Sequence, residues 1–156
     1  NSFKRINAKV TKSGATWSPN SISFSGNNRT HLIRVPDKGR FELRLMDGAV
    51  NPYLLQAGTI AAGLDGIKLR RNPGKPLNNN MYVNSNKNKK INKLPKSLDI
   101  ALTKFSKSKV MQKAFSKKTI QSYLKLKNIE IKRFRLSKNN KINGITKWEK
   151  INTIDC

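Results

Sequence analysis

Four arginines and one glutamate lie within eighteen residues, in the segment NRTHLIRVPDKGRFELRL (Asn28 to Leu45). Strand alternation in GRFELRL places Arg40, Glu42 and Arg44 on one face and the apolar residues on the other. Guanidinium groups match the planar geometry of phosphate and carboxylate anions. Flanking positive charge keeps a carboxylate ionised, and an ionised carboxylate suits a divalent metal. The pattern therefore predicts an anion site, with Glu42 available to a metal.

The alternative interpretation is a solvated strand face with cross-strand salt bridges. Arg29 and Arg34 weigh against it, because arginines without matching acids accumulate where an anion binds. Arg29 and Arg34 have opposite parity, odd and even, so a regular strand would point them to opposite faces. We therefore predict either a bulge in the strand or a position before the strand for Arg29. The chain has eight acidic residues, and Glu42 has the one convincing setting for a metal ligand. We therefore do not expect this chain to complete a metal site by itself.

The elements that must position these residues are strands followed by a helix. Phe41, Leu43 and Leu45 are predicted to face a core. Asn51 fits the N-cap of the following helix and Pro52 its first position. That helix, YLLQAGTIAAGLDGI, is apolar on nearly every side and rich in small residues, which predicts a buried core helix.

The remaining segments are predicted from periodicity and turn residues. Residues 1–20 are expected to form a loop, 22–45 strands broken by a PDKG turn, and 70–90 a surface connector. Apolar spacing predicts three further helices, at about residues 97–105, 109–114 and 118–136.

Two side-chain interactions are predicted in the helical part of the chain. Lys127 and Glu130, three residues apart on the long helix, predict a structural ion pair rather than a catalytic one. The end of the chain, ITKWEKINTIDC, suits a closing helix anchored by Trp148.

The net charge of +25 on 156 residues is unevenly distributed: +5 over residues 1–67 and +20 over 68–156. Most of the lysines lie in the second part, together with many asparagines. An AT-rich genome would enrich both residue types without a ligand. A basic nucleic-acid-binding module stays open as an alternative, although aromatic residues that could stack on bases are sparse there. The sequence shows no membrane span or signal peptide, and its only cysteine is Cys156, so a reducing cytoplasmic location is expected.

The segments NSFKRINA, NRTHLIRVP and GRFELRLMDGAVNPYLLQAGTIAAGLDGI resemble, in order and spacing, the C-terminal half of the glutamine synthetase catalytic domain. The resemblance is strong over residues 1–67 and looser beyond them. It implies an α+β fold, with antiparallel strands as one wall of an active site and a mostly helical C-terminus. Residues 1–156 are then one portion of that domain: active-site strands and buried helix (1–67), basic connector (68–96) and helical part (97–156).

The resemblance implies an ATP-dependent ligase of nitrogen metabolism. Such enzymes phosphorylate glutamate to γ-glutamyl phosphate, and ammonia then displaces the phosphate; ATP and Mg²⁺ or Mn²⁺ are required. Arg5 and Arg44 match arginines that bind glutamate. Arg29 and Arg34 match arginines that contact ATP and the transferring phosphoryl group, so Arg29 is assigned a catalytic role. Arg40 matches an arginine near the nucleotide.

Two further positions complete the comparison with this family. Glu42 matches a ligand of a metal ion that bridges the phosphates. Trp17 replaces a glutamate that, in many members, closes over the intermediate and helps to deprotonate ammonium. The segment ATWSPN resembles the branch with γ-glutamylmethylamide synthetases and type III glutamine synthetases. An indole removes an anionic ammonium site and adds a cation–π surface, so methylamine is considered beside ammonium as the substrate.

Family members are large homo-oligomeric rings, and their other metal ligands lie in parts that this sequence does not contain. The 156 residues are therefore expected to be a fragment that is inactive alone. No membrane association is expected, and nucleic acid is not expected as a partner. A non-catalytic remnant that docks on a ligase ring stays open as another alternative.

Overall fold

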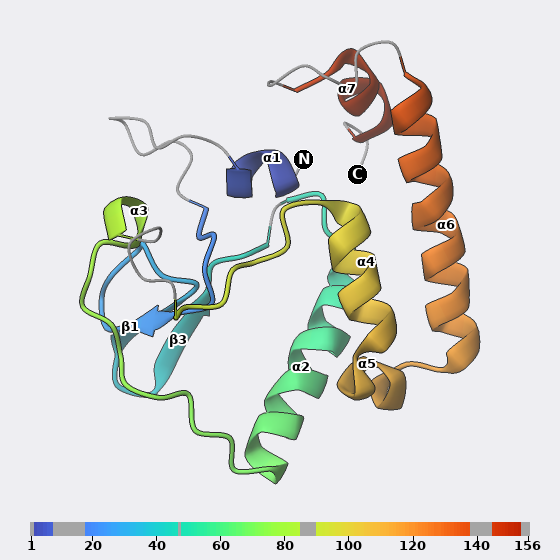
Figure 1. Ribbon diagram of the computed structural model, residues 1–156. Helices are drawn as coiled ribbons and strands as arrows, with labels where there is room; N and C mark the ends of the chain where they lie inside the picture. Colours follow the sequence, from blue (N-terminus) through green and yellow to red (C-terminus); the bar gives the residue numbers. More distant parts are fainter. Residues whose placement is uncertain (1, 8–17, 47, 85–89, 138–144, 154–156) are drawn as a thin grey trace. The chain divides into compact units, whose positions relative to one another are not determined.

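The structure is a computed structural model that describes residues 2–7, 18–46, 48–84, 90–137 and 145–153 (Figure 1). Its described elements are, in chain order, α1 (Ser2–Asn7), β1 (Phe24–Ser25), β2 (Ile33–Asp37), β3 (Arg40–Leu43), α2 (Pro52–Lys68), α3 (Met81–Asn84), α4 (Leu98–Lys107), α5 (Lys109–Ala114), α6 (Lys117–Leu136) and α7 (Lys147–Thr153). A small sheet and several helices make this an α+β fold with a mostly helical C-terminus, as predicted.

The chain divides into two compact units, each built from two segments. The strand unit consists of Asn1–Asp47 and Gly74–Lys96, and the helical unit of Gly48–Pro73 and Ser97–Cys156. The residues between 74 and 96 therefore belong with the strands, and α2 belongs with the later helices.

The sheet of the strand unit has the order β1-β2-β3. β2 and β3 are antiparallel and meet at the predicted PDKG turn, where Gly39 has a φ of 80°, a value that glycine adopts without steric cost. Their register shifts between Arg34 and Asp37, and it sets Arg34 directly opposite Glu42. β1 is parallel to β2, whereas the sequence predicted antiparallel strands only. The intervening turn brings the chain back in the same direction, so Ile33 pairs with Phe24.

The predicted surface connector returns to the sheet. The backbone N–H of Leu77 donates to the Phe24 carbonyl (3.0 Å), and that of Leu94 donates to the Asn20 carbonyl (2.9 Å). The short helix α3, which was not predicted, also lies in this segment. The buried apolar side chains of the strand unit come from α1, the turn before β2 and the connector: Ile6, Leu32, Met81 and Leu94.

The prediction of a loop over residues 1–20 is wrong for its first part, where α1 forms. The segment SFKRIN has no glycine or proline, and Phe3 and Ile6 are three residues apart, so one helical face can cover apolar surface. Ile6 is indeed buried. Residues 8–17, which include Trp17, lie outside the described residues.

Helix α2 begins as predicted but is not a buried core helix. The Asn51 Oδ1 caps it by accepting from the Leu54 N–H (3.0 Å). None of its side chains is buried, and Tyr53 is 81% exposed. Its apolar residues point in every direction, and in the helical unit α5 covers one side of it. Gly58 faces α5, since a Cβ there would lie 3.9 Å from the Met111 sulfur. A small residue therefore does permit close approach at this contact with α5.

The other helices of the helical unit form near their predicted bounds. α4 packs against α5 and α6. The rings of Phe105 and Tyr123 meet edge to face, with their centroids 5.6 Å apart. Leu102 and Ile120 are buried in this unit. No described helix is long and apolar enough to span a membrane.

Both predicted side-chain interactions of this part are present. The Lys127 Nζ donates to both carboxylate oxygens of Glu130, each at 2.9 Å. The Trp148 ring of α7 meets the Phe134 ring of α6 edge to face, with centroids 5.5 Å apart. The ion pair and the anchored closing helix are thus confirmed.

A reciprocal cap begins α7 and carries a testable prediction. The Thr146 Oγ1 accepts from the Glu149 N–H (3.1 Å), and a Glu149 carboxylate oxygen accepts from the Thr146 N–H (2.7 Å); both residues are buried. We expect Thr146→Val to lower the free energy of unfolding by about 1–2 kcal/mol in a urea titration, because the valine keeps the shape but loses the acceptor. The control Thr103→Val, at an exposed site on α4, should cost under about 0.5 kcal/mol. Equal losses in the two variants would contradict the capping role.

Candidate functional site

The centre of the candidate site is a cross-strand ion pair between β2 and β3. The Arg34 Nη1 donates to the Glu42 Oε1 at 2.6 Å, and the Arg34 Nε donates to the Asn27 Oδ1 at 2.9 Å. The Arg34 side chain is 12% exposed and that of Glu42 is 41% exposed. The Arg34 guanidinium is therefore held in place on two sides, while part of the Glu42 carboxylate faces solvent.

The charges around Glu42 favour its ionised form. The hydrogen bond from Arg34 is the main cause that lowers the pKa of this carboxyl. Burial is the second-largest effect and acts in the opposite direction, and the positive charges of Arg34, Arg40 and Arg44 each lower the pKa by a smaller amount. The prediction that neighbouring arginines keep Glu42 ionised is confirmed in direction.

Arg29 and Arg40 lie at opposite ends of this hairpin. Arg29 is in the turn before β2, one of the two alternatives that its parity left open, and its side chain is exposed. Arg40 donates to the Asp37 carboxylate at 2.8 Å at the exposed end of the hairpin. Among the residues that the structure describes, no acceptor contacts the Arg29 guanidinium, so its positive charge is available to an anion.

Arg5, Arg44 and Tyr82 form a second cluster of the strand unit. The Arg5 Nη1 donates to the Met46 carbonyl at 3.1 Å. Burial raises the pKa of the Tyr82 phenol, and the positive charges of Arg44 and then Arg5 act in the opposite direction, which places all three within electrostatic range. The Arg44 Nη1 is buried and has no acceptor within the described part of the chain. A buried guanidinium N–H without an acceptor is costly, and a bound carboxylate would satisfy it. Tyr82 was not among the predicted site residues, because it lies within the connector, which has no regular apolar pattern.

The apolar face of β3 departs from its prediction. Phe41 is 64% exposed, whereas Leu43 and Leu45 are half-buried. The expectation that all three face a core is thus wrong for Phe41. Alternation determines on which face a side chain lies, but it does not supply an element to cover that face.

His31 is the most buried side chain of the site region, and it was not among the predicted site residues. It is 0% exposed, and its ring nitrogens lie 3.0 Å from the Ser23 Oγ and 2.9 Å from the Asn79 carbonyl oxygen. Burial lowers the pKa of this imidazole, against an opposing effect of the Asn79 hydrogen bond. No local sequence pattern links positions 31 and 79.

This histidine predicts a pH dependence of stability. Its pKa is lower in the folded chain than the unfolded value of about 6.5, so the unfolded chain takes up the proton first as the pH falls. The free energy of unfolding should therefore decrease as the pH falls through about 6.5, and stop decreasing from this cause below the folded pKa. Urea titrations of the wild type and His31→Gln between about pH 8 and about pH 5 measure the difference. Because His31 is the chain's only histidine, identical slopes would contradict this prediction.

The described residues do not make a divalent metal site on their own. They contain no group of three or more His, Cys, Asp or Glu side chains that could surround an ion. Glu42 offers one carboxylate, already bonded to Arg34, whereas Mg²⁺ takes about six oxygen ligands. Of the described residues, Glu42 therefore offers one ligand, and a complete metal site would need others.

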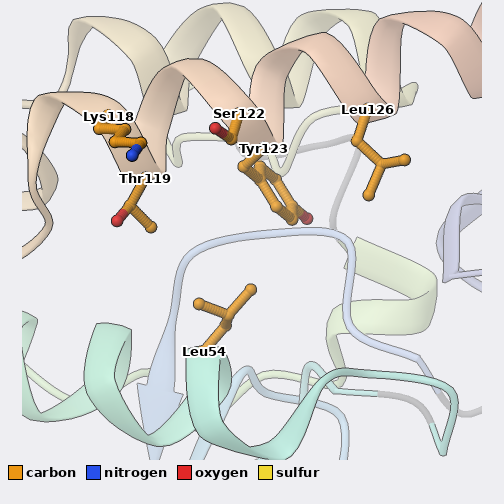
Figure 2. A pocket seen from close by; sticks show the side chains of 6 residues that line it. All are labelled: Leu54, Lys118, Thr119, Ser122, Tyr123 and Leu126. Carbon is orange, nitrogen blue, oxygen red and sulfur yellow. The ribbon is translucent and has the colours of Figure 1, made fainter.

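The helical unit has a pocket of about 410 Å³ between α2 and α6. Figure 2 shows the Leu54 side chain of α2 pointing toward Tyr123 and Leu126 of α6. The surface of this pocket is mainly apolar, and Lys118, Thr119 and Ser122 complete its lining. None of the predicted site residues lines it, so it does not define the candidate site.

Comparisons with known proteins give one consistent result. A family model described as the catalytic domain of glutamine synthetase matches residues 1–143. A glutamine synthetase of Rhizobium meliloti is 48% identical over 155 residues, covering 99% of this chain and 34% of that protein. A glutamate–methylamine ligase of Methyloversatilis universalis is 41% identical over 133 residues, covering 83% of this chain and 30% of that protein.

A solved structure supports the same relationship. A GmaS–ADP complex matches 99% of this chain and 36% of its own chain, with a TM-score of 0.76 and 38% identity. An apo GmaS structure matches with a TM-score of 0.71 and 35% identity. The chain spans about a third of the length of the curated relatives named above.

Proposed function

This chain belongs to the glutamine synthetase family, and from that premise we propose that it is the C-terminal part of the catalytic domain of an ATP-dependent glutamate–ammonia or glutamate–amine ligase. The supporting observation is the set of arginines in the strand unit. Arg44 has a buried N–H that finds no acceptor among the described residues, and Arg29 has an exposed guanidinium. Together they suit two different anions, a carboxylate and a phosphate.

In the proposed reaction an oxygen of the glutamate γ-carboxylate attacks the γ-phosphorus of ATP, and ADP leaves. The amine nitrogen then attacks the acyl carbon of γ-glutamyl phosphate, loses a proton, and phosphate leaves with the former carboxylate oxygen. Phosphoryl transfer of this kind depends mainly on positioning and on neutralising charge. ATP and divalent metal ions supply the phosphoryl group and part of that neutralisation.

The residues of this chain have distinct tasks in the proposal. Arg5 and Arg44 bind the glutamate substrate, and the contact of Arg5 with the Met46 carbonyl orients its guanidinium. Arg29 contacts the transferring phosphoryl group from its turn. Arg34, fixed by Glu42 and Asn27, directs its remaining surface toward the nucleotide.

Two other assigned residues lie along β3. Arg40 lies near the nucleotide and exchanges its exposed pairing with Asp37 for a phosphate contact. Glu42 contributes one carboxylate to a metal site that other parts of the enzyme complete. A chain that lacks those parts would be inactive alone, and the working enzyme is proposed to be a cytoplasmic homo-oligomer.

The amine substrate is ammonium or methylamine. The relative from Methyloversatilis universalis is a glutamate–methylamine ligase, and that from Rhizobium meliloti is a glutamine synthetase. Trp17, in place of a flap glutamate, favours the alkylated amine because an indole face attracts a cation without a carboxylate.

Phosphate release by the native polypeptide that carries these residues tests the proposal. With glutamate and ATP present, we expect release that depends on an added amine, and mass spectrometry of that polypeptide establishes its length. A strong preference for ammonium over methylamine would exclude the alkylamine assignment. No glutamate-dependent release with either amine would contradict the ligase itself.

A further inference from the structure

The contacts of His31 select one form of its ring. The Asn79 carbonyl oxygen, 2.9 Å from Nε2, can only accept, so Nε2 carries the hydrogen. In a neutral imidazole Nδ1 is then an acceptor, and the Ser23 hydroxyl at 3.0 Å donates to it. The fully buried ring thus connects the strand β1 region to the connector by two directed hydrogen bonds.

The turn that carries Arg29 is bound to the same connector segment. The Asn28 Nδ2 donates to the Asn79 carbonyl (3.3 Å), and the Met81 N–H donates to the Thr30 Oγ1 (3.0 Å). Within the turn, the Asn28 Oδ1 accepts from the Thr30 N–H (3.0 Å) and hydroxyl (2.8 Å). The residues on both sides of Arg29 are therefore fixed, whereas its own side chain is exposed.

We propose that His31 is a positioning residue for Arg29. It clamps the Asn28–His31 turn to the Asn78–Met81 segment and so directs the Arg29 guanidinium toward the phosphoryl group of ATP. This inference rests on the proposed function. An arginine on an unrestrained turn must lose that freedom when the anion binds, which weakens binding. A buried imidazole costs desolvation that an apolar side chain of similar size does not. The two hydrogen bonds of the imidazole fix the orientation of the turn, which an apolar side chain would not do.

Two variants at position 31 distinguish the effect of the hydrogen bonds of His31 from the effect of the space that its side chain fills. His31→Phe fills the space without either hydrogen bond, and we expect it to raise the KM for ATP about tenfold, with a smaller effect on kcat. His31→Gln keeps an N–H donor that can reach the Asn79 carbonyl, and its KM should stay within about threefold of wild type. An unchanged KM in His31→Phe would overturn the proposal.

A double-mutant cycle tests whether His31 acts through Arg29. In an Arg29→Gln background, His31→Phe should raise the KM for ATP no further, because the guanidinium that it positions is gone. Leu32→Ala is the matched control, since Leu32 is buried beside His31 but takes no part through its side chain in these hydrogen bonds. It should lower the urea midpoint and leave the KM unchanged. Additive effects of the two substitutions would overturn the positioning role.

Failure of this inference can be told apart from failure of the proposed function. If the wild-type polypeptide releases no phosphate with glutamate and ATP, the ligase proposal fails, and ATP binding measured by calorimetry replaces KM in the same cycle. Nitrogen-15 NMR of the single histidine reads the ring directly. A neutral ring with the hydrogen on Nε2 supports the clamp, and a ring with its hydrogen on Nδ1 overturns it whatever the activity.

Discussion

Arg44→Met in the native polypeptide should raise the KM for glutamate about 10- to 100-fold and leave the KM for ATP within about twofold of wild type. A hydrogen bond to a charged group contributes about 1.5–3 kcal/mol, and about 1.4 kcal/mol corresponds to a tenfold change in affinity. The Arg44 Nη1 is buried without an acceptor among the residues described, and in the proposed function the glutamate carboxylate becomes its partner. Methionine preserves much of the apolar stem and removes the charge.

Steady-state kinetics with each substrate varied in turn measure this prediction. Arg71→Met is a suitable control, because Arg71 is an arginine of the helical unit whose Nε donates to the Asp65 carboxylate at 2.8 Å. It should change neither KM. An Arg44→Met enzyme with the wild-type KM for glutamate would remove Arg44 from the glutamate site.

Glu42→Gln should lower kcat/KM by about a hundredfold, the upper end of the loss seen when a metal site loses a supporting group. The amide has the shape of the carboxylate but no charge. The substitution would therefore weaken the binding of a metal by residue 42. It would also weaken the ion pair with Arg34, whose Nη1 lies 2.6 Å from the Glu42 Oε1. Excess Mg²⁺ should recover part of the activity.

The same hairpin offers a matched control for that substitution. Asp37 pairs with Arg40 at 2.8 Å, but both side chains are largely exposed, and exposed pairs contribute little. Asp37→Asn should leave activity within about threefold of wild type. If the two substitutions reduce activity equally, general loss of charge on the hairpin explains the result better than a role at the site.

Local sequence signals predicted the parts of the site that depend on neighbours along the chain. The alternation in GRFELRL predicted strand β3, and the parity of Arg29 predicted either a bulge or the position before β2 that it takes. The Asn51–Pro52 pair predicted the start of α2, since an N-cap and a first-turn proline act within a few residues. In each case the determining interactions lie inside one turn or one strand.

The features that were missed depend on residues far apart in the sequence. The burial of α2 was predicted wrongly because an apolar helix becomes buried only where other elements cover it, and α5 covers one side. The role of the asparagine-rich connector was missed because the His31–Asn79 contact joins positions 48 residues apart. Composition described that connector as solvated, whereas its backbone carbonyl and N–H groups hold the arginine turn in place.

The central claim is that this arginine site serves phosphoryl transfer from ATP to the γ-carboxylate of glutamate. The most direct test supplies the native polypeptide with ATP, an amine and glutamate labelled with oxygen-18 in its γ-carboxylate, and analyses the released phosphate by mass spectrometry. The account predicts one labelled oxygen in each phosphate, because the carboxylate oxygen that attacks phosphorus leaves with it. Phosphate released without label would contradict the acyl phosphate route and with it the assigned roles of Arg29 and Arg44.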